Sequence, residues 1–228
     1  KANQTGFSIK NGDSVTLTYN ENNNKYSIEV DGGESTSKVV YEVISGDCAT
    51  VDEAGIVSVI KAGTVEIKAT RKADANYLEA SDVITIEVKR ANQSFTFKDG
   101  KNISKLYGTL SYKNDVVNTV VAGAADGKGY STSEPTYAII GENNIGVELK
   151  ADGTIEFTDS VGKVGKITIQ ATKAPDDCYE GFSDTYELEL SYLETSDKPV
   201  VSGDKTDSAN DWYTGNVKIN APAGYQIS

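Results

Sequence analysis

The side chains that most often carry enzymatic chemistry are scarce in this sequence. Histidine is absent from all 228 residues. Without histidine, a Ser-His-Asp triad and a Cys-His pair cannot form, and zinc loses one of its commonest ligands. Only carboxylate, lysine or tyrosine chemistry remains open. We therefore predict that the chain is not an enzyme, and we assign no catalytic residue, no cofactor-binding residue and no metal-binding residue.

Six carboxylates in two groups are the strongest candidates for a site. A glycosidase needs two carboxyl groups on opposite sides of a cleft, whereas calcium prefers oxygen ligands supplied by loops. The chain lacks the D-x-D-x-D-G pattern of a dedicated calcium loop. We predict solvated turns at both groups, leave calcium open as the one cofactor, and place carboxylate catalysis last. The two groups are Asp47 with Asp52 and Glu53, and Asp176 with Asp177 and Glu180.

The segment Gly-Ala-Ala-Asp-Gly-Lys-Gly at 123–129 resembles a phosphate-binding loop only in part. Such a loop needs Gly, four residues, Gly-Lys and a Ser or Thr that opens a helix. Here one spacer residue is missing, Gly129 replaces the Ser or Thr, and no helical pattern follows. We predict a loop between strands that runs to Tyr130, and no nucleotide binding.

Cysteine and charge also limit the classes of function. The two cysteines, Cys48 and Cys178, fall in different modules of the division given below, so each is predicted to be a small, partly buried apolar residue. The net charge is −12. Lysines are spread evenly, whereas nucleic acid or an anionic membrane surface would require a basic patch. An acidic surface that keeps the protein soluble is the simplest interpretation.

The overall composition is typical of a soluble globular protein of one to three domains, because 38% of the residues are hydrophobic and 25% are charged. No apolar run approaches the ~18 residues of a membrane-spanning helix. The first residues lack the layout of a signal peptide, and the chain begins without Met. We expect it to be a piece of a longer protein, with targeting and anchoring segments elsewhere.

Short segments of alternating apolar and polar residues recur along the chain, whereas helical periodicity is almost absent. They are rich in Val, Ile, Thr and Tyr and are separated by Gly, Asn and Asp, which is typical of β-strands. In the first half, strands are predicted at 15–19, 25–30, 39–44, 56–60, 64–70 and 83–88. Within 64–70 the alternation predicts Val65, Ile67 and Ala69 in a core and Glu66, Lys68 and Thr70 in water.

An internal repeat divides the chain. The tetrapeptide Lys-Ala-Asn-Gln at 1–4 returns as Arg-Ala-Asn-Gln at 90–93, and residues 41–90 match 137–192 with small insertions. Two modules with some seven short strands each indicate β-sandwiches rather than one large barrel. The shared landmarks are Tyr41 and Tyr137, Gly55 and Gly153, and Tyr77 and Tyr179.

The repeat predicts three regions. Residues 1–90 and 91–193 form the two β-sandwich modules, and residues 194–228 form a polar linker and the truncated start of a third β module. The junction between the first two has no Pro or Gly, which predicts modules held end to end with limited bending. Trp212 in the third region packs against the second module, fills an incomplete core, or serves as a ligand platform.

The segment Ala-Thr-Val-Asp-Glu-Ala-Gly-Ile-Val at 49–57, with Gly-Thr-Val-Glu-Ile-Lys-Ala-Thr at 63–70, resembles the bacterial immunoglobulin-like domain of the intimin and invasin type. That family combines a V-D-x-x-G-x-V turn with an alternating G-T-x-x-I-x-A-T strand. Residues 146–172 carry a more divergent form, with Asp152, Gly153 and the same closing Ala-Thr. The resemblance implies an all-β fold of tandem immunoglobulin-like β-sandwiches in a surface protein. Residues 212–228 also resemble repeats in long surface proteins of Gram-positive bacteria.

These observations favour a structural role. We expect a non-catalytic stalk or adhesion module of a bacterial cell-surface or secreted protein, located outside the cell on the surface or in the wall. The partners left open are a host surface protein or a glycan, beside neighbouring immunoglobulin-like modules of the same chain. Neither nucleic acid nor insertion of this fragment into a membrane is expected.

The alternative is a carbohydrate-binding accessory module of an extracellular polysaccharide-degrading enzyme. Tyrosine is abundant, with 13 copies, and aromatic rings can stack on sugars. Strand preference and core filling explain the same tyrosines. An exposed row of tyrosines on one sheet would favour carbohydrate binding, whereas tyrosines buried between the sheets would favour the stalk. An enzyme that uses carboxylates alone is a third alternative, and it would require a cleft between the modules.

Overall fold

The computed structural model describes residues 1–20, 24–158 and 163–192, and the backbone of four short strands between 200 and 220. The described residues form strands, turns and loops without a helix, which confirms the predicted all-β fold. The chain divides into two compact units. The first consists of Lys1–Thr96, Val117–Pro135 and Thr172–Phe182, and the second of Phe97–Val116, Thr136–Ala171 and Ser183–Ser228. Because both units are discontinuous, the boundaries near 90 and 193 stay predictions.

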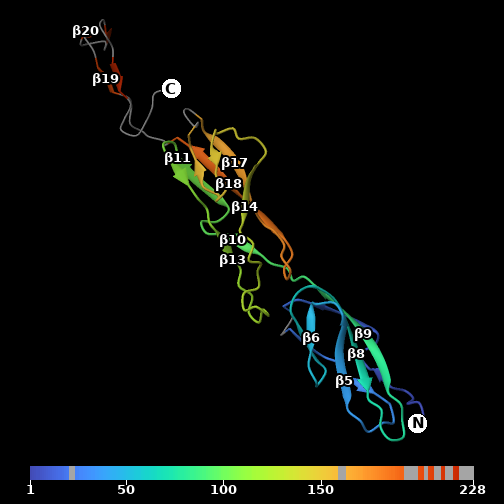
Figure 1. Cartoon of the computed structure of the whole chain (residues 1–228). Coiled ribbons are helices and arrows are strands. Elements are labelled where there is room, and N and C mark those ends of the chain that lie inside the picture. The colour runs from blue at the N-terminus through green and yellow to red at the C-terminus, as the bar shows by residue number, and fades with distance from the viewer. Residues whose placement is uncertain are drawn as a thin grey trace. The chain divides into compact units, whose positions relative to one another are not determined.

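Nine strands lie among the described residues of the first 90, that is 1–20 and 24–90. A four-stranded sheet has the order β2-β9-β8-β5, a three-stranded sheet the order β3-β7-β6, and β1 pairs with β4. Figure 1 shows β5, β8 and β9 side by side in the first of these sheets. The strands β2 and β9 run parallel, and β8 is antiparallel to both of its neighbours. The bounds are β1 Ser8–Ile9, β2 Ser14–Thr18, β3 Lys25–Ser27, β4 Val30–Asp31, β5 Val39–Ser45, β6 Ala49–Val51, β7 Ile56–Val59, β8 Gly63–Arg71 and β9 Ala80–Lys89.

The core of the first unit lies between its two larger sheets. On β8, Val65, Ile67 and Ala69 are fully buried, and they share one core with Val57 of β7. The alternation of side chains along β8 therefore places Val65, Ile67 and Ala69 in the core, as predicted. The prediction that Thr70 faces water is wrong, because this side chain is 6% exposed. Its two cross-strand neighbours, on β5 and β9, flank it on the same face of the sheet.

In the described parts of 95–191, which leave out 159–162, nine further strands repeat this topology. Their sheets have the orders β11-β18-β17-β14, β12-β16-β15 and β10-β13, so each strand takes the place of the one nine positions earlier. The strands β11 and β18 are again parallel. The bounds are β10 Phe95–Phe97, β11 Asn102–Leu106, β12 Ser111–Tyr112, β13 Val116–Asn118, β14 Thr136–Ile140, β15 Glu148–Leu149, β16 Ile155–Glu156, β17 Gly165–Lys173 and β18 Phe182–Ser191.

Four short strands are described between residues 200 and 220. They are β19 Val200–Ser202, β20 Lys205–Asp207, β21 Trp212–Tyr213 and β22 Lys218–Asn220, and β19 pairs with β22 and β20 with β21. The predicted linker at 194–199 and the role of the Trp212 side chain lie outside the described residues.

The core of the second unit contains a buried hydroxyl group without a partner. Tyr186 is 1% exposed, and its ring packs edge-on against Phe97 with centroids 4.9 Å apart. Among the described residues, none accepts or donates a hydrogen bond at its hydroxyl oxygen. Burial accordingly raises the pKa of this phenol.

We expect the substitution Tyr186→Phe to raise the free energy of unfolding by about 1 kcal/mol, because it removes a buried unsatisfied hydroxyl and keeps the ring. Urea denaturation of the whole chain measures the change. The matched control is Tyr112→Phe, which loses a 2.9 Å hydrogen bond to Asp99 and should lower the stability slightly. A clear loss of stability in Tyr186→Phe would contradict the prediction.

Candidate functional site

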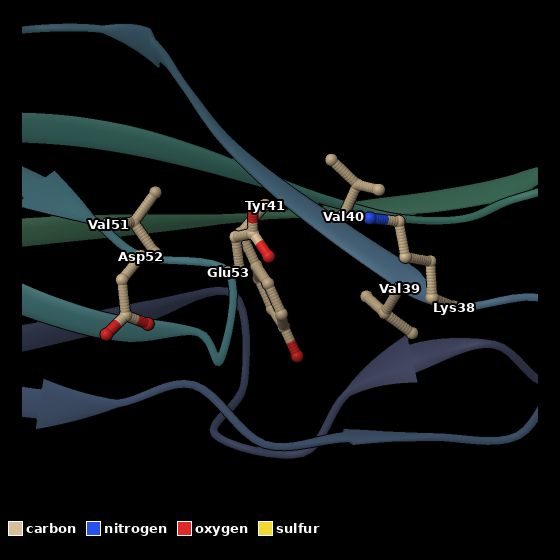
Figure 2. A pocket seen from close by; sticks show the side chains of 7 residues that line it. All are labelled: Lys38, Val39, Val40, Tyr41, Val51, Asp52 and Glu53. Carbon is tan, nitrogen blue, oxygen red and sulfur yellow. The ribbon is translucent and has the colours of Figure 1, made fainter.

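A cavity of about 400 Å³ opens beside the start of β5 in the first unit. Figure 2 shows Tyr41 lying between Asp52 on one side and Val39 on the other. The aromatic ring packs on Gly55, where a Cβ atom would lie 2.8 Å from Cζ of the ring. Since Gly55 also has a φ of 78°, a side chain at this turn is excluded both by space and by backbone conformation.

At this cavity the carboxylate of Asp52 binds the backbone of its own turn. Oδ1 of Asp52 accepts hydrogen bonds from the backbone N–H groups of Ala54 and Ile56, both at 2.9 Å. Glu53 and Lys38 complete the polar lining, and both are exposed. The third member of the predicted group, Asp47, forms an exposed ion pair with Lys61 instead. The arrangement can hold a small polar molecule, but it does not place two carboxyl groups on opposite walls.

The second predicted group of carboxylates is also built into a turn. Oδ1 of Asp176 accepts the backbone N–H groups of Cys178 and Tyr179, both at 2.8 Å, and Oδ2 accepts the N–H of Thr132 at 3.2 Å. Asp177 and Glu180 are exposed. Within the described part of the chain, no three His, Cys, Asp or Glu side chains are grouped so that they could hold a metal ion.

The segment at 123–129 lies between β13 and β14. Its carboxylate, Oδ1 of Asp126, accepts hydrogen bonds from the N–H groups of Lys128 and Gly129 and from the hydroxyl of Tyr179. These backbone donors are the ones that a phosphate would need, and here they bind a side chain of the protein. The loop fixes Tyr179, which is 1% exposed.

Both cysteines are free thiols. Cys48 is 1% exposed and Cys178 is partly buried. Burial raises the pKa of each thiol, so the thiolate form is disfavoured at neutral pH.

The repeated Ala-Asn-Gln segment is a polar clamp, as its first copy illustrates. Ala2 forms a parallel bridge with Tyr77. The Gln4 side chain donates from Nε2 to the carbonyl of Leu78 at 2.7 Å, and its Oε1 accepts the N–H of Ser35 at 3.1 Å. One glutamine therefore ties the start of the module to two segments that lie far away in sequence.

The second copy makes the same contacts. Ala91 forms a parallel bridge with Tyr179. Gln93 donates from Nε2 to the carbonyl of Glu180 at 2.6 Å, and its Oε1 accepts the N–H of Ser131 at 3.0 Å. Sequence reasoning used the repeat only to divide the chain into modules and missed this clamp. The repeated Ser-Thr-Ser at 35–37 and 131–133 was the signal that could have revealed it.

A carboxylate completes each clamp. In the first copy, Oδ1 of Asp74 accepts the N–H groups of Asn76 and Tyr77, and Oδ2 accepts the N–H of Thr36 at 3.0 Å. Asp176 has the equivalent role in the second copy. The backbone hydrogen bonds, above all that from Asn76, lower the pKa of Asp74 to about 2.

We expect Asp74 to contribute to acid unfolding. Because its pKa is depressed in the folded chain, its contribution is fully present above the unfolded value of about 4 and is lost as the pH falls through the folded value. The substitution Asp74→Asn should therefore flatten the pH dependence of stability between about pH 4 and pH 2. Thermal unfolding followed across this range tests the prediction, and superimposable pH profiles of variant and parent would refute it.

A basic side chain lies at the end of each of the equivalent strands β8 and β17, half-buried at Arg71 and almost fully buried at Lys173. Arg71 donates from Nη1 to the carbonyl of Ser35 at 3.4 Å. Lys173 is 3% exposed and donates from Nζ to the carbonyl of Ser131 at 2.7 Å. Each basic side chain thus donates to the same Ser-Thr-Ser segment that the glutamine binds.

Part of the chain matches a known protein family. Residues 4–80 match the family model described as Bacterial Ig-like domain (group 2). No curated protein matches the chain in sequence. Among the described residues, no helix is long and apolar enough to cross a membrane.

The solved structures that match the chain include three cadherin fragments. Drosophila N-cadherin EC1-4 is 11% identical with a TM-score of 0.35, and the match covers 82% of this chain and 50% of that chain. Human Protocadherin-24 EC1-2 is 11% identical with a TM-score of 0.32, covering 84% and 100%. Chicken VE-cadherin EC1-2 is 14% identical with a TM-score of 0.31, covering 80% and 98%. The chain thus spans half the length of the N-cadherin fragment.

Proposed function

We propose that this chain, in which residues 4–80 match the bacterial Ig-like domain family of group 2, is a load-bearing stalk segment of a bacterial cell-surface or secreted protein. It works outside the cell and performs no catalysis. Neighbouring immunoglobulin-like modules are its partners along the chain, and a distal part of the parent protein binds the host surface protein or glycan.

The parallel pairing of β2 with β9, and of β11 with β18, carries this proposal. In the first unit, β2 and β9 are in register from Ser14 opposite Thr85 to Thr18 opposite Lys89. A force applied to the two ends of the module pulls the start of β2 and the end of β9 in opposite directions along the strands. Because the strands are parallel, this force shears all their hydrogen bonds together instead of opening them one by one.

The second unit has the same pairing. The strands β11 and β18 are parallel and in register from Asn102 opposite Glu187 to Leu106 opposite Ser191. The same force therefore meets a second set of bonds in the same shear geometry. A repeated mechanical element of this kind suits a protein that keeps a binding part at a distance from the cell.

Force spectroscopy on single molecules tests the stalk. Pulled between its ends, the chain should unfold in two separate high-force events, one for each parallel pair. The control has handles at Lys72 and Glu79, beside the adjoining ends of the antiparallel strands β8 and β9, where the force peels the bonds in sequence. Its first event should occur at a several-fold lower force. Equal forces in the two geometries would count against a load-bearing role.

The burial of tyrosine supports the stalk over the carbohydrate-binding alternative. Tyr19, Tyr179 and Tyr186 are all under 9% exposed and belong to the cores. One observation favours the alternative, because Tyr192 is 46% exposed and its ring lies 5.3 Å from that of Tyr107. A glycan array with and without calcium decides between them. Saturable saccharide binding that is lost in Tyr192→Ala would favour the carbohydrate-binding module.

A further inference from the structure

Lys173 and Asn118 bring an amine and a carboxamide together inside the first unit. Nζ of Lys173, at the end of β17, lies 2.8 Å from Oδ1 of Asn118, at the end of β13. The carbonyl of Ser131 holds the same nitrogen at 2.7 Å, and the Tyr130 ring centroid is 4.9 Å away. Three sides of the amine are therefore fixed.

The surroundings of Lys173 make its ammonium group easier to deprotonate than that of an exposed lysine. The side chain is almost fully buried, and no carboxylate of the described residues lies within ion-pair distance. Glu134 and Asp176 act on it only through their more distant charge, and burial outweighs them and lowers the pKa of Lys173. A neutral amine has two N–H groups, which the two carbonyl oxygens satisfy, and a lone pair that makes it a nucleophile.

The first copy of the repeat shows which features are special to the second. Arg71 stands where the second copy has Lys173, and a guanidinium is always charged. The backbone N–H of Thr119 donates to the carbonyl of Ser94, and that of Gly33 donates to the carbonyl of Thr5, which is the equivalent of Ser94. Gly33 is therefore equivalent to Thr119, and the preceding Gly32 is equivalent to Asn118. The module that lacks the amine therefore also lacks the amide. In the first copy, Arg71 alone donates to the carbonyls of the Ser-Thr-Ser segment, without an asparagine beside it. Binding of these carbonyls therefore does not explain why Asn118 is present in the second copy.

We propose that Lys173 and Asn118 react to form a covalent isopeptide bond within the chain. Nζ of Lys173 attacks Cγ of Asn118 and forms the new C–N bond. The bond from Cγ to Nδ2 breaks, the amide nitrogen takes a proton from the attacking amine, and one ammonia leaves. A primary amide becomes a secondary amide, so no oxidant, reductant or other reactant is required. The hydrogen bond holds the amine beside the carboxamide, which reduces the entropy that the reaction has to lose.

Intact mass spectrometry of the whole purified chain tests the bond. The parent should be lighter than its sequence mass by one ammonia, and a tryptic digest should contain one branched peptide joining the segments around residues 118 and 173. The variants Lys173→Arg and Asn118→Ala should each have their full sequence mass. Arg71 shows that an arginine fits the equivalent position, so Lys173→Arg is expected to fold.

Two controls make the result decisive. Asn118 could also lose ammonia by cyclising with its own backbone, and that loss would persist in Lys173→Arg and overturn the proposal. Arg71→Lys adds an amine in the copy where Gly32 stands in place of the asparagine, so this variant should lose only the one ammonia of the parent. A parent chain that keeps its full sequence mass after prolonged incubation at neutral pH also overturns the proposal.

Discussion

The substitution Gln93→Ala is expected to lower the free energy of unfolding by about 3 kcal/mol. Gln93 is 7% exposed and makes hydrogen bonds to Ser131 and to the carbonyl of Glu180. Ser131 is fully buried, so its backbone N–H loses its acceptor and cannot reach water. An unsatisfied buried donor costs more than the hydrogen bond itself contributes, which is why the expected loss is large.

Gln4→Ala is the matched control for this prediction. Gln4 makes equivalent bonds in the first copy, to Ser35 and Leu78, but it is only partly buried. Water can replace its bonds, so we expect a loss of about 1 kcal/mol. Urea denaturation of both variants and the parent measures the difference. Equal effects of the two substitutions would show that burial does not set the strength of the clamp.

The sequence predicted the fold because the large strands have a local signature. In β8 and β17, alternate apolar residues mark the buried face, and the Gly55 and Gly153 turns recur at equivalent positions. The shortest strands could not be predicted. β1 and β4 have two residues each, too few for an alternating pattern, and they are held by pairing with each other.

The candidate site was less predictable because its contacts are made between distant segments. The sequence singled out Tyr41, Gly55 and the carboxylates near them, but not that the ring would pack on the glycine beside a cavity. The contact of Lys173 with Asn118 spans 55 residues, and no local pattern marks either side chain. Such pairs follow from strand order and register, which a single sequence does not specify.

Loss of the cross-link in Lys173→Arg is expected to lower the free energy of unfolding by about 4 kcal/mol. The bond closes a loop of 55 residues and removes conformational freedom from the unfolded chain, as a disulfide of the same span would. The arginine keeps an N–H donor to the Ser131 carbonyl, as Arg71 does to Ser35, so the effect reports the covalent bond rather than the hydrogen bond. Urea denaturation of linked and unlinked chain measures the change.

The chemical origin of this effect can be separated from packing. Asn118→Ala removes the same cross-link from the opposite side, so both variants should unfold at nearly the same urea concentration. The double variant should then be no less stable than either single variant, because one covalent bond can be lost only once. Additive losses would mean that the two side chains act independently, and the stability of the module would then rest on hydrogen bonds alone.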